Sequence, residues 1–175
     1  MLGNPFSFDI VWEENIDCNK IAEDGFITLN SATGGYVYNA EGVIKSGEGF
    51  MVYAETKRVS LEYYKTPAKS RRDNSDYINI IAPNKNASDN VILRFGDTES
   101  AGLPKLDNIN PNIADVYVRN EGKRYGIFSY NPDVTEIPLY FDAKEMGTYT
   151  LTFDVKGDYE NLYLLDKMTG EKVNL

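Results

Sequence analysis

Hydrophobic and polar residues alternate strictly along residues 148–155, where Tyr, Leu, Phe and Val occupy every second position. Side chains of a strand point to opposite faces with a period of two, so this pattern buries one face and exposes the other. We expect an antiparallel sheet packed on a core. Its inward positions are Tyr149, Leu151, Phe153 and Val155. Their expected packing partners on other strands include Phe50, Val52, Leu93 and Phe95.

Short runs rich in Val, Ile, Tyr, Phe and Thr recur along the chain, separated by Gly, Pro, Asn and Asp. This layout is typical of all-β domains. We predict an antiparallel β-sandwich of jelly-roll or immunoglobulin-like form, with very little helix. The predicted strands are residues 6–11, 25–29, 35–38, 49–55, 58–63, 77–82, 90–95, 115–119, 125–130, 136–141, 148–155, 161–165 and 171–174.

Other segments predict central strands, turns and loops. Residues 50–54 and 91–95 are apolar on both faces or nearly so, which predicts central strands. Residues 164–171 predict a hairpin with Gly170 at the left-handed position. Residues 12–22 are the only stretch that could be helical, and only for a turn or two. The polar segment 65–74 predicts a long surface loop, followed by a second loop at 96–112.

Length and composition fit one globular module. The 175 residues are 42% hydrophobic and 26% charged, so we expect a single module over residues 1–175 with an internal loop boundary at 65–76. A net charge of −9 repels phosphate backbones and anionic lipid surfaces, which argues against a nucleic-acid partner. No apolar run approaches the ~18 residues that would span a bilayer, so we predict no membrane insertion.

The residue inventory narrows the possible chemistry. The chain has no histidine, and its single cysteine, Cys18, cannot form an internal disulfide. Serine or cysteine triads that use histidine are therefore excluded within this chain, and we predict no metal, no cofactor and no enzyme. Acidic pairs such as Glu13–Glu14 lack the ligand order of a calcium loop and fit a solvated surface. A small hydrolase using two carboxylates across a cleft stays open as an alternative.

Aromatic residues make up 13% of the chain, with 13 tyrosines. An exposed Tyr or Trp ring on a sandwich face can cover the flat apolar side of a sugar. Most aromatic residues of such a fold are core or cross-strand partners. The candidates for ligand binding are Trp12, Tyr63, Tyr64, Tyr117 and Tyr140.

Six segments, in order, resemble a recurring β-sandwich region of large surface or secreted proteins of the Bacteroidota. Residues 2–6 are similar to its "GNPF/GNPY" turn, residues 47–52 to its "GQGFFV" strand, and residues 90–95 to a strand ending in Arg-Phe. Further on, residues 137–139, 147–151 and 164–170 are similar to its "IPLGF", "G-x-YTL" and "LEDKLTG" segments. The resemblance covers most of the chain.

The resemblance implies a non-catalytic region ahead of a C-terminal sorting domain of the type nine secretion system, and hence an extracellular or cell-surface location. It also implies that the chain is an excised piece of a larger protein, lacking a strand ahead of Gly3. An open edge of that kind predicts self-association. The expected function is a structural or binding module, with cell adhesion among its roles and a protein or glycan at the cell surface as partner. The alternative is a carbohydrate-binding module attached to a degradative enzyme.

Overall fold

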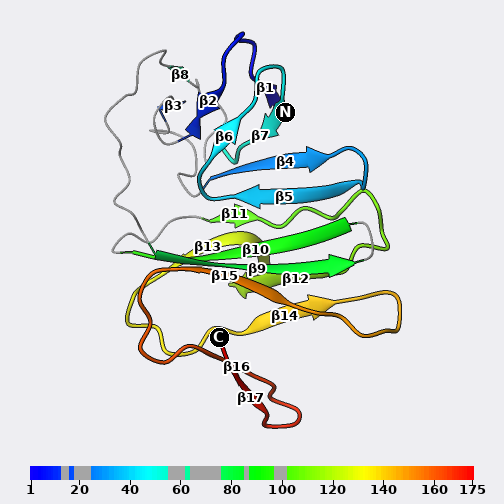
Figure 1. The fold of residues 1–175 in the computed structure, drawn as a ribbon, viewed down its shortest axis with the longest axis vertical. Coiled ribbons are helices and arrows are strands. Elements are labelled where there is room, and N and C mark those ends of the chain that lie inside the picture. Colours follow the sequence, from blue (N-terminus) through cyan, green and yellow to red (C-terminus); the bar gives the residue numbers. More distant parts are fainter. Residues whose placement is uncertain (13–15, 18–24, 55–61, 64–75, 85–86, 97–101) are drawn as a thin grey trace.

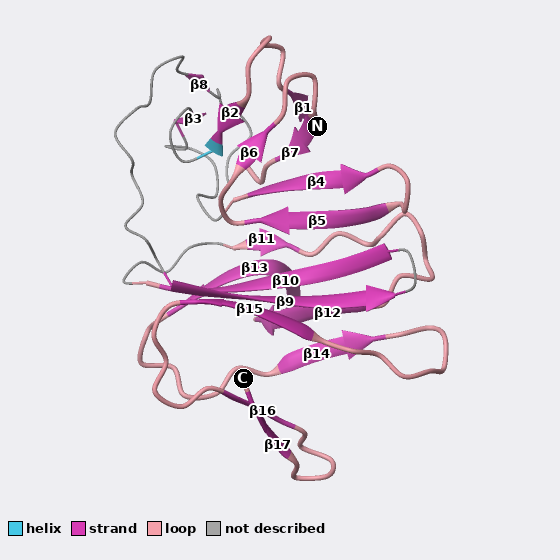
Figure 2. Ribbon diagram, in the orientation of Figure 1, coloured by secondary structure: helices cyan, strands magenta, loops and turns pink. Residues whose placement is uncertain are grey.

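The computed structural model describes residues 1–12, 16–17, 25–54, 62–63, 76–84, 87–96 and 102–175. These residues form β-strands gathered into five sheets, which confirms the all-β fold class. The N-terminal strands lie at one end of the molecule, the two larger sheets follow, and the C-terminal hairpin lies at the other end (Figures 1 and 2).

The smaller of the two main sheets has four antiparallel strands in the order β1-β7-β4-β5. Their bounds are β1 (Leu2–Gly3), β7 (Gly49–Met51), β4 (Phe26–Asn30) and β5 (Gly35–Asn39). A tight turn joins β4 to β5, where the Gly34 N–H donates to the Asn30 carbonyl at 2.8 Å. Gly34 has φ +75°, a conformation that glycine adopts without steric cost.

The larger sheet has seven strands, with the order β14-β12-β13-β10-β9-β15 and β11 beside β13. Its strands are β9 (Asp76–Asn84), β10 (Ala87–Phe95), β11 (Leu103–Pro104), β12 (Asp115–Asn120), β13 (Lys123–Tyr130), β14 (Leu139–Asp142) and β15 (Thr152–Lys156). All pairings are antiparallel except β10 with β13, which is parallel. Leu139 of β14 and Phe153 of β15 pack against one hydrophobic cluster, so the two outer strands curl around it.

Three two-stranded sheets complete the described part of the chain. They pair β2 (Ile10–Val11) with β6 (Val43–Ile44), β3 (Ile16–Asp17) with β8 (Glu62–Tyr63), and β16 (Tyr163–Leu165) with β17 (Lys172–Asn174). The last pair confirms the predicted C-terminal hairpin. Gly170 there has φ +73° and donates its N–H to the Asp166 carbonyl at 2.8 Å.

Strand β10 is covered on both faces, which confirms its prediction as a central strand. Ile92 packs between the two main sheets, in a cluster with Ile27 and Tyr38 from the smaller sheet. Its neighbours Val91 and Leu93 point the other way, into the cluster enclosed by the curled sheet. Alternation along one strand therefore supplies two separate cores.

The structure corrects the expectation of one shared core. Phe50 and Val52 belong to a third cluster around Trp12 at the N-terminal end, whereas Leu93 and Phe95 belong to the cluster inside the curled sheet. Phe153 packs in that second cluster as expected, but Val155 is 37% exposed. Val155 therefore does not share the burial of its cross-strand partner Ile78, which is 4% exposed.

Some predicted boundaries were also wrong. The strand expected at 148–155 begins at Thr152, and the loop expected at 96–112 contains β11. Ile16 and Asp17, placed in the possible helical stretch, form β3, because pairing with β8 outweighs a weak local helical preference. The predicted loop at 65–74 lies outside the described residues, as does nearly all of the strand predicted at 58–63 and of the boundary expected at 65–76.

Gly126 of β13 tests how tightly the two main sheets are packed. A Cβ added at Gly126 would lie 2.2 Å from Cε1 of Tyr38, whose ring is 2% exposed. We expect Gly126→Ala to lower the free energy of unfolding by about 1–3 kcal/mol, as overpacking does. Urea unfolding followed by fluorescence measures the change. Gly147→Ala is the matched control, since nothing lies within 4 Å of that position, and equal stabilities of the two variants would contradict the packing.

Candidate functional site

Three of the four buried polar residues of the described chain meet where the two main sheets face each other. Asp89 and Asn90 are adjacent on β10, and Lys105 directly follows β11. The Lys105 N–H donates to the Arg124 carbonyl at 2.9 Å, so the backbone continues along β13 beyond the end of β11. All three side chains are buried. We call Lys105, Asp89, Asn90 and Tyr38 the buried network.

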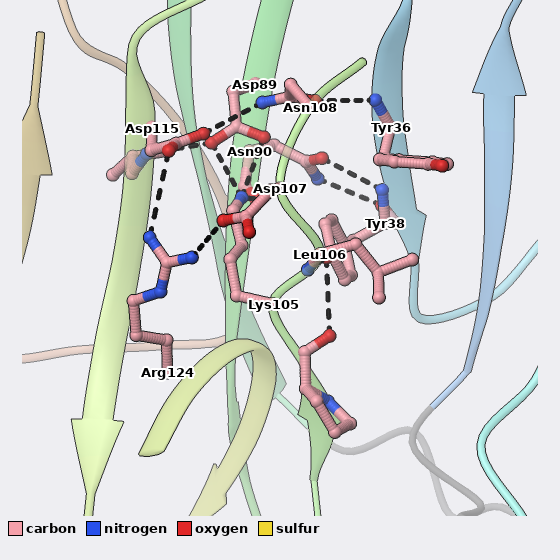
Figure 3. A network of polar contacts seen from close by, with 12 residues as sticks. Tyr36, Tyr38, Asp89, Asn90, Lys105, Leu106, Asp107, Asn108, Asp115 and Arg124 are labelled. Atoms are coloured by element: carbon pink, nitrogen blue, oxygen red, sulfur yellow. Dashed lines mark hydrogen bonds and ion pairs between the residues drawn. The ribbon is translucent and has the colours of Figure 1, made fainter. Parts of the chain in front are cut away.

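Lys105 makes a close ion pair inside this network (Figure 3). Its Nζ lies 2.7 Å from Oδ1 and 2.6 Å from Oδ2 of Asp89 and donates to the Asn90 carbonyl at 2.9 Å. It also lies 4.7 Å from the centre of the Tyr38 ring. Oδ2 of Asp89 accepts a further hydrogen bond from the Val116 N–H at 2.7 Å. The side chains of the pair have no solvent exposure, so water does not compete with these contacts.

Asn90 joins the two main sheets, because its side-chain amide makes the two hydrogen bonds that the backbone of a neighbouring strand would make. Its Oδ1 accepts from the Tyr38 N–H and its Nδ2 donates to the Tyr38 carbonyl, both at 2.9 Å. Nδ2 also donates to Oδ1 of Asn79 on β9 at 3.0 Å. One side-chain amide therefore satisfies both backbone groups of a residue on β5.

The Tyr38 hydroxyl closes the other end of the junction. It accepts the Leu106 N–H at 2.6 Å and donates to the Pro104 carbonyl at 3.3 Å. Burial raises the pKa of this hydroxyl well above its ordinary value, so it stays protonated. Tyr38 thereby holds the segment after β11 against the smaller sheet.

A more exposed rim of polar contacts continues from the buried network. Asn108 accepts from the Tyr36 N–H at 2.8 Å and donates to Oδ1 of Asp115 at 2.9 Å. Arg124 forms an ion pair with Asp107 and lies 3.8 Å from Oδ2 of Asp115. These contacts extend the same junction from β5 to β12 (Figure 3).

Burial disfavours the charged form of both members of the ion pair. It raises the pKa of the Asp89 carboxyl and lowers the pKa of the Lys105 amine, while the attraction between the two groups opposes both changes. The site therefore brings the neutral and charged forms of the pair closer in free energy than water does. The chemistry available is proton exchange along the Nζ–Oδ contact.

Two of the predicted aromatic candidates come together on the larger sheet. Tyr117 of β12 and Tyr140 of β14 are cross-strand partners, with ring centres 5.5 Å apart and ring planes 10° from parallel. The guanidinium of Arg119 lies 4.9 Å from the Tyr140 ring centre, and the Tyr117 hydroxyl donates to Oδ2 of Asp142 at 2.7 Å. We call Tyr117, Arg119, Tyr140 and Asp142 the tyrosine stack.

Tyr140 alone of the pair presents open surface. Tyr140 is 37% exposed, whereas Tyr117 is 1% exposed, because Tyr140, Arg119 and Arg124 surround its ring. Burial, followed by the hydrogen bond to Asp142, raises the pKa of the Tyr117 hydroxyl. Tyr117 is therefore a support for Tyr140 and not itself a contact surface.

Of the three remaining aromatic candidates, only Trp12 has a described side chain. Trp12 is 1% exposed and packs against Phe26 and Phe50, so its ring is part of the core at the N-terminal end and not an exposed platform. Tyr63 lies in β8, but its side chain and all of Tyr64 lie outside the described part of the chain.

The sequence reasoning missed the buried network completely. Asp89, Asn90 and Lys105 occur in segments that also fit exposed strand ends and loops, and polar residues of these types are exposed in most proteins. The short interval Leu103–Leu106, in which Lys105 stands among apolar neighbours, was the only local signal.

In comparisons with protein-family models, curated proteins and solved structures, nothing matches the chain. Within the described ranges, no three His, Cys, Asp or Glu side chains are grouped so that they could hold a metal ion. A search of the same ranges finds no helix long and apolar enough to span a membrane.

The buried ion pair predicts a large difference between two identical substitutions. Lys105→Met leaves the Asp89 carboxylate buried without its partner, so we expect it to lower the free energy of unfolding by about 3–5 kcal/mol. Lys45→Met removes an exposed pair with Asp9 and serves as the control, with little change expected. Urea denaturation of both variants gives the comparison, and two small, equal losses would contradict the assigned burial.

Proposed function

We propose that this chain is a non-catalytic structural or binding module of a bacterial cell-surface or secreted protein, with cell adhesion among its roles. The observation that carries the proposal is that the polar groups of the buried network are all bonded to other groups of the protein. Its carboxylate, amine and amide all bond to groups of the protein, and the Asn90 amide joins the two main sheets. Groups held in this way reinforce a scaffold, whereas catalytic groups are aimed at a space that a substrate can enter.

The proposed location follows from the resemblance of six segments to surface and secreted proteins of the Bacteroidota. One of these segments, residues 90–95, falls in β10 and includes Asn90 of the buried network. The partner proposed for the module is a protein or a glycan at the cell surface.

The location can be tested in a bacterium that makes the protein. We expect an antibody against the module to detect it in the medium or on intact cells, and protease added to intact cells to remove the cell-bound signal. A cytoplasmic enzyme followed in the same samples controls for lysis. Protein found only with that enzyme, inside protease-resistant cells, would contradict the proposal.

A carbohydrate-binding role is the second candidate, and the tyrosine stack favours it. Tyr140 offers a partly exposed ring fixed from behind by Tyr117, with Arg119 and Asp142 beside it. An aromatic ring can cover the apolar face of a sugar, while flanking charged groups hydrogen-bond its hydroxyls. The rigid support lowers the entropy lost when a ligand binds.

Glycan binding would depend on one ring. If a glycan array identifies a ligand, we expect Tyr140→Ala to weaken its binding about tenfold, the effect of losing roughly 1.4 kcal/mol. Tyr163→Ala is the matched control, because Tyr163 is also exposed and lies under a cation, Lys172, but in the C-terminal hairpin. Equal affinities of the Tyr140 and Tyr163 variants would remove the tyrosine stack as the binding surface.

A further inference from the structure

Lys105 and Asp89 place an amine and a carboxyl group in contact within a space closed to water. Both oxygens of Asp89 lie 2.6–2.7 Å from Nζ, and neither side chain has any solvent exposure. The two residues come from different segments, sixteen positions apart in the sequence. These are the two functional groups that combine into an amide when water is lost.

Burial shifts both groups toward their reactive forms. A free amine is a nucleophile and a carboxylic acid is a better electrophile than a carboxylate, but in water at neutral pH the pair is charged. Burial lowers the pKa of the Lys105 amine and raises that of the Asp89 carboxyl, and both changes promote transfer of one proton from Nζ to the carboxyl. The short contact itself supplies the path for that proton.

The neighbouring groups hold the pair in an orientation suited to addition. The Asn90 carbonyl accepts one N–H of Nζ at 2.9 Å, which limits rotation of the amine. The Val116 N–H donates to Oδ2 of Asp89 at 2.7 Å, where it would stabilise negative charge developing on that oxygen. The Tyr38 ring, 4.7 Å from Nζ, lies against the amine.

Proximity changes the equilibrium as well as the rate. Condensation of a free amine and acid is disfavoured in water, but groups held in contact act at effective concentrations of up to ~10⁵–10⁸ M. The product would also replace two buried charges by a neutral amide, which lowers the desolvation cost that the ion pair carries. The enclosed site keeps water from reversing the reaction.

We propose that Lys105 and Asp89 condense to an intramolecular amide that cross-links β10 to the segment following β11. After proton transfer, Nζ bonds to Cγ of Asp89 and Oδ2 takes up the developing negative charge. The bond from Cγ to Oδ1 then breaks, and Oδ1 leaves as water with the transferred proton and one proton of the amine. One ammonium and one carboxylate thus give one amide and one water, with no oxidant, cofactor or second protein.

Mass spectrometry of the whole chain tests the cross-link. Purified protein, both fresh and after prolonged folded incubation at neutral pH, is expected to reach a mass about 18 Da below that of its sequence, the loss of one water. Trypsin does not cleave after an acylated lysine. The digest should therefore contain residues 86–94 joined to residues 95–119, in place of separate peptides 86–94 and 95–105.

Two results would overturn the proposal. One is a mass equal to that of the sequence at every time, with peptides 86–94 and 95–105 released separately, which is the behaviour of an ordinary ion pair. The other is a water loss that persists in Lys105→Met or Lys105→Arg, since that loss would come from cyclisation at an aspartate and not from the amine. The peptide map of the unaltered chain decides the matter even if both variants fail to fold.

Discussion

The contact between the two main sheets is the constraint on which the rest of this structure depends. The Asn90 side chain of β10 reaches across it and binds both backbone groups of Tyr38, and beside it Asp89 receives Lys105 from the segment after β11. Unpaired buried polar groups cost roughly 1–3 kcal/mol each, so these residues stabilise the fold only while they remain together. The same dependence makes the arrangement specific, because a shifted register would leave several of them without partners.

Close packing at the junction follows from what surrounds the polar residues. Gly126 leaves space for the Tyr38 ring, and the Tyr38 hydroxyl then reaches the backbone beyond β11. Ile92 and Ile127 fill the apolar part of the same layer. The Tyr38 ring therefore packs against both Gly126 and Lys105, and the three residues come from three segments of the chain.

The tyrosine stack is a different kind of arrangement, placed at the margin of the larger sheet. The Tyr117 ring is buried and stacks against the Tyr140 ring, and Arg119 contacts both rings. Such a surface is available to a ligand without rearrangement of the core. Strand β12 contacts both arrangements, because its Val116 N–H donates to Asp89 of the buried network and its Tyr117 belongs to the tyrosine stack.

The local pattern of the sequence was sufficient for the all-β class, for β10 as a central strand and for the C-terminal hairpin. Alternation, turn residues and β-branched runs are properties of neighbouring residues, and they act wherever the segment lies. The sequence predicted Tyr117 and Tyr140 as outward-facing residues on two separate strands, but it did not predict that they pair. Their contact depends on the register between β12 and β14.

Only the tertiary structure decided the burial of Trp12, the division of the interior into three clusters and the meeting of Lys105 with Asp89. Each results from contacts between segments far apart in the chain, to which a single sequence assigns no distance. A lysine in a polar loop and a lysine in a closed core can have similar local sequences. What separates them is the loss of water around the side chain, and that depends on how the sheets pack.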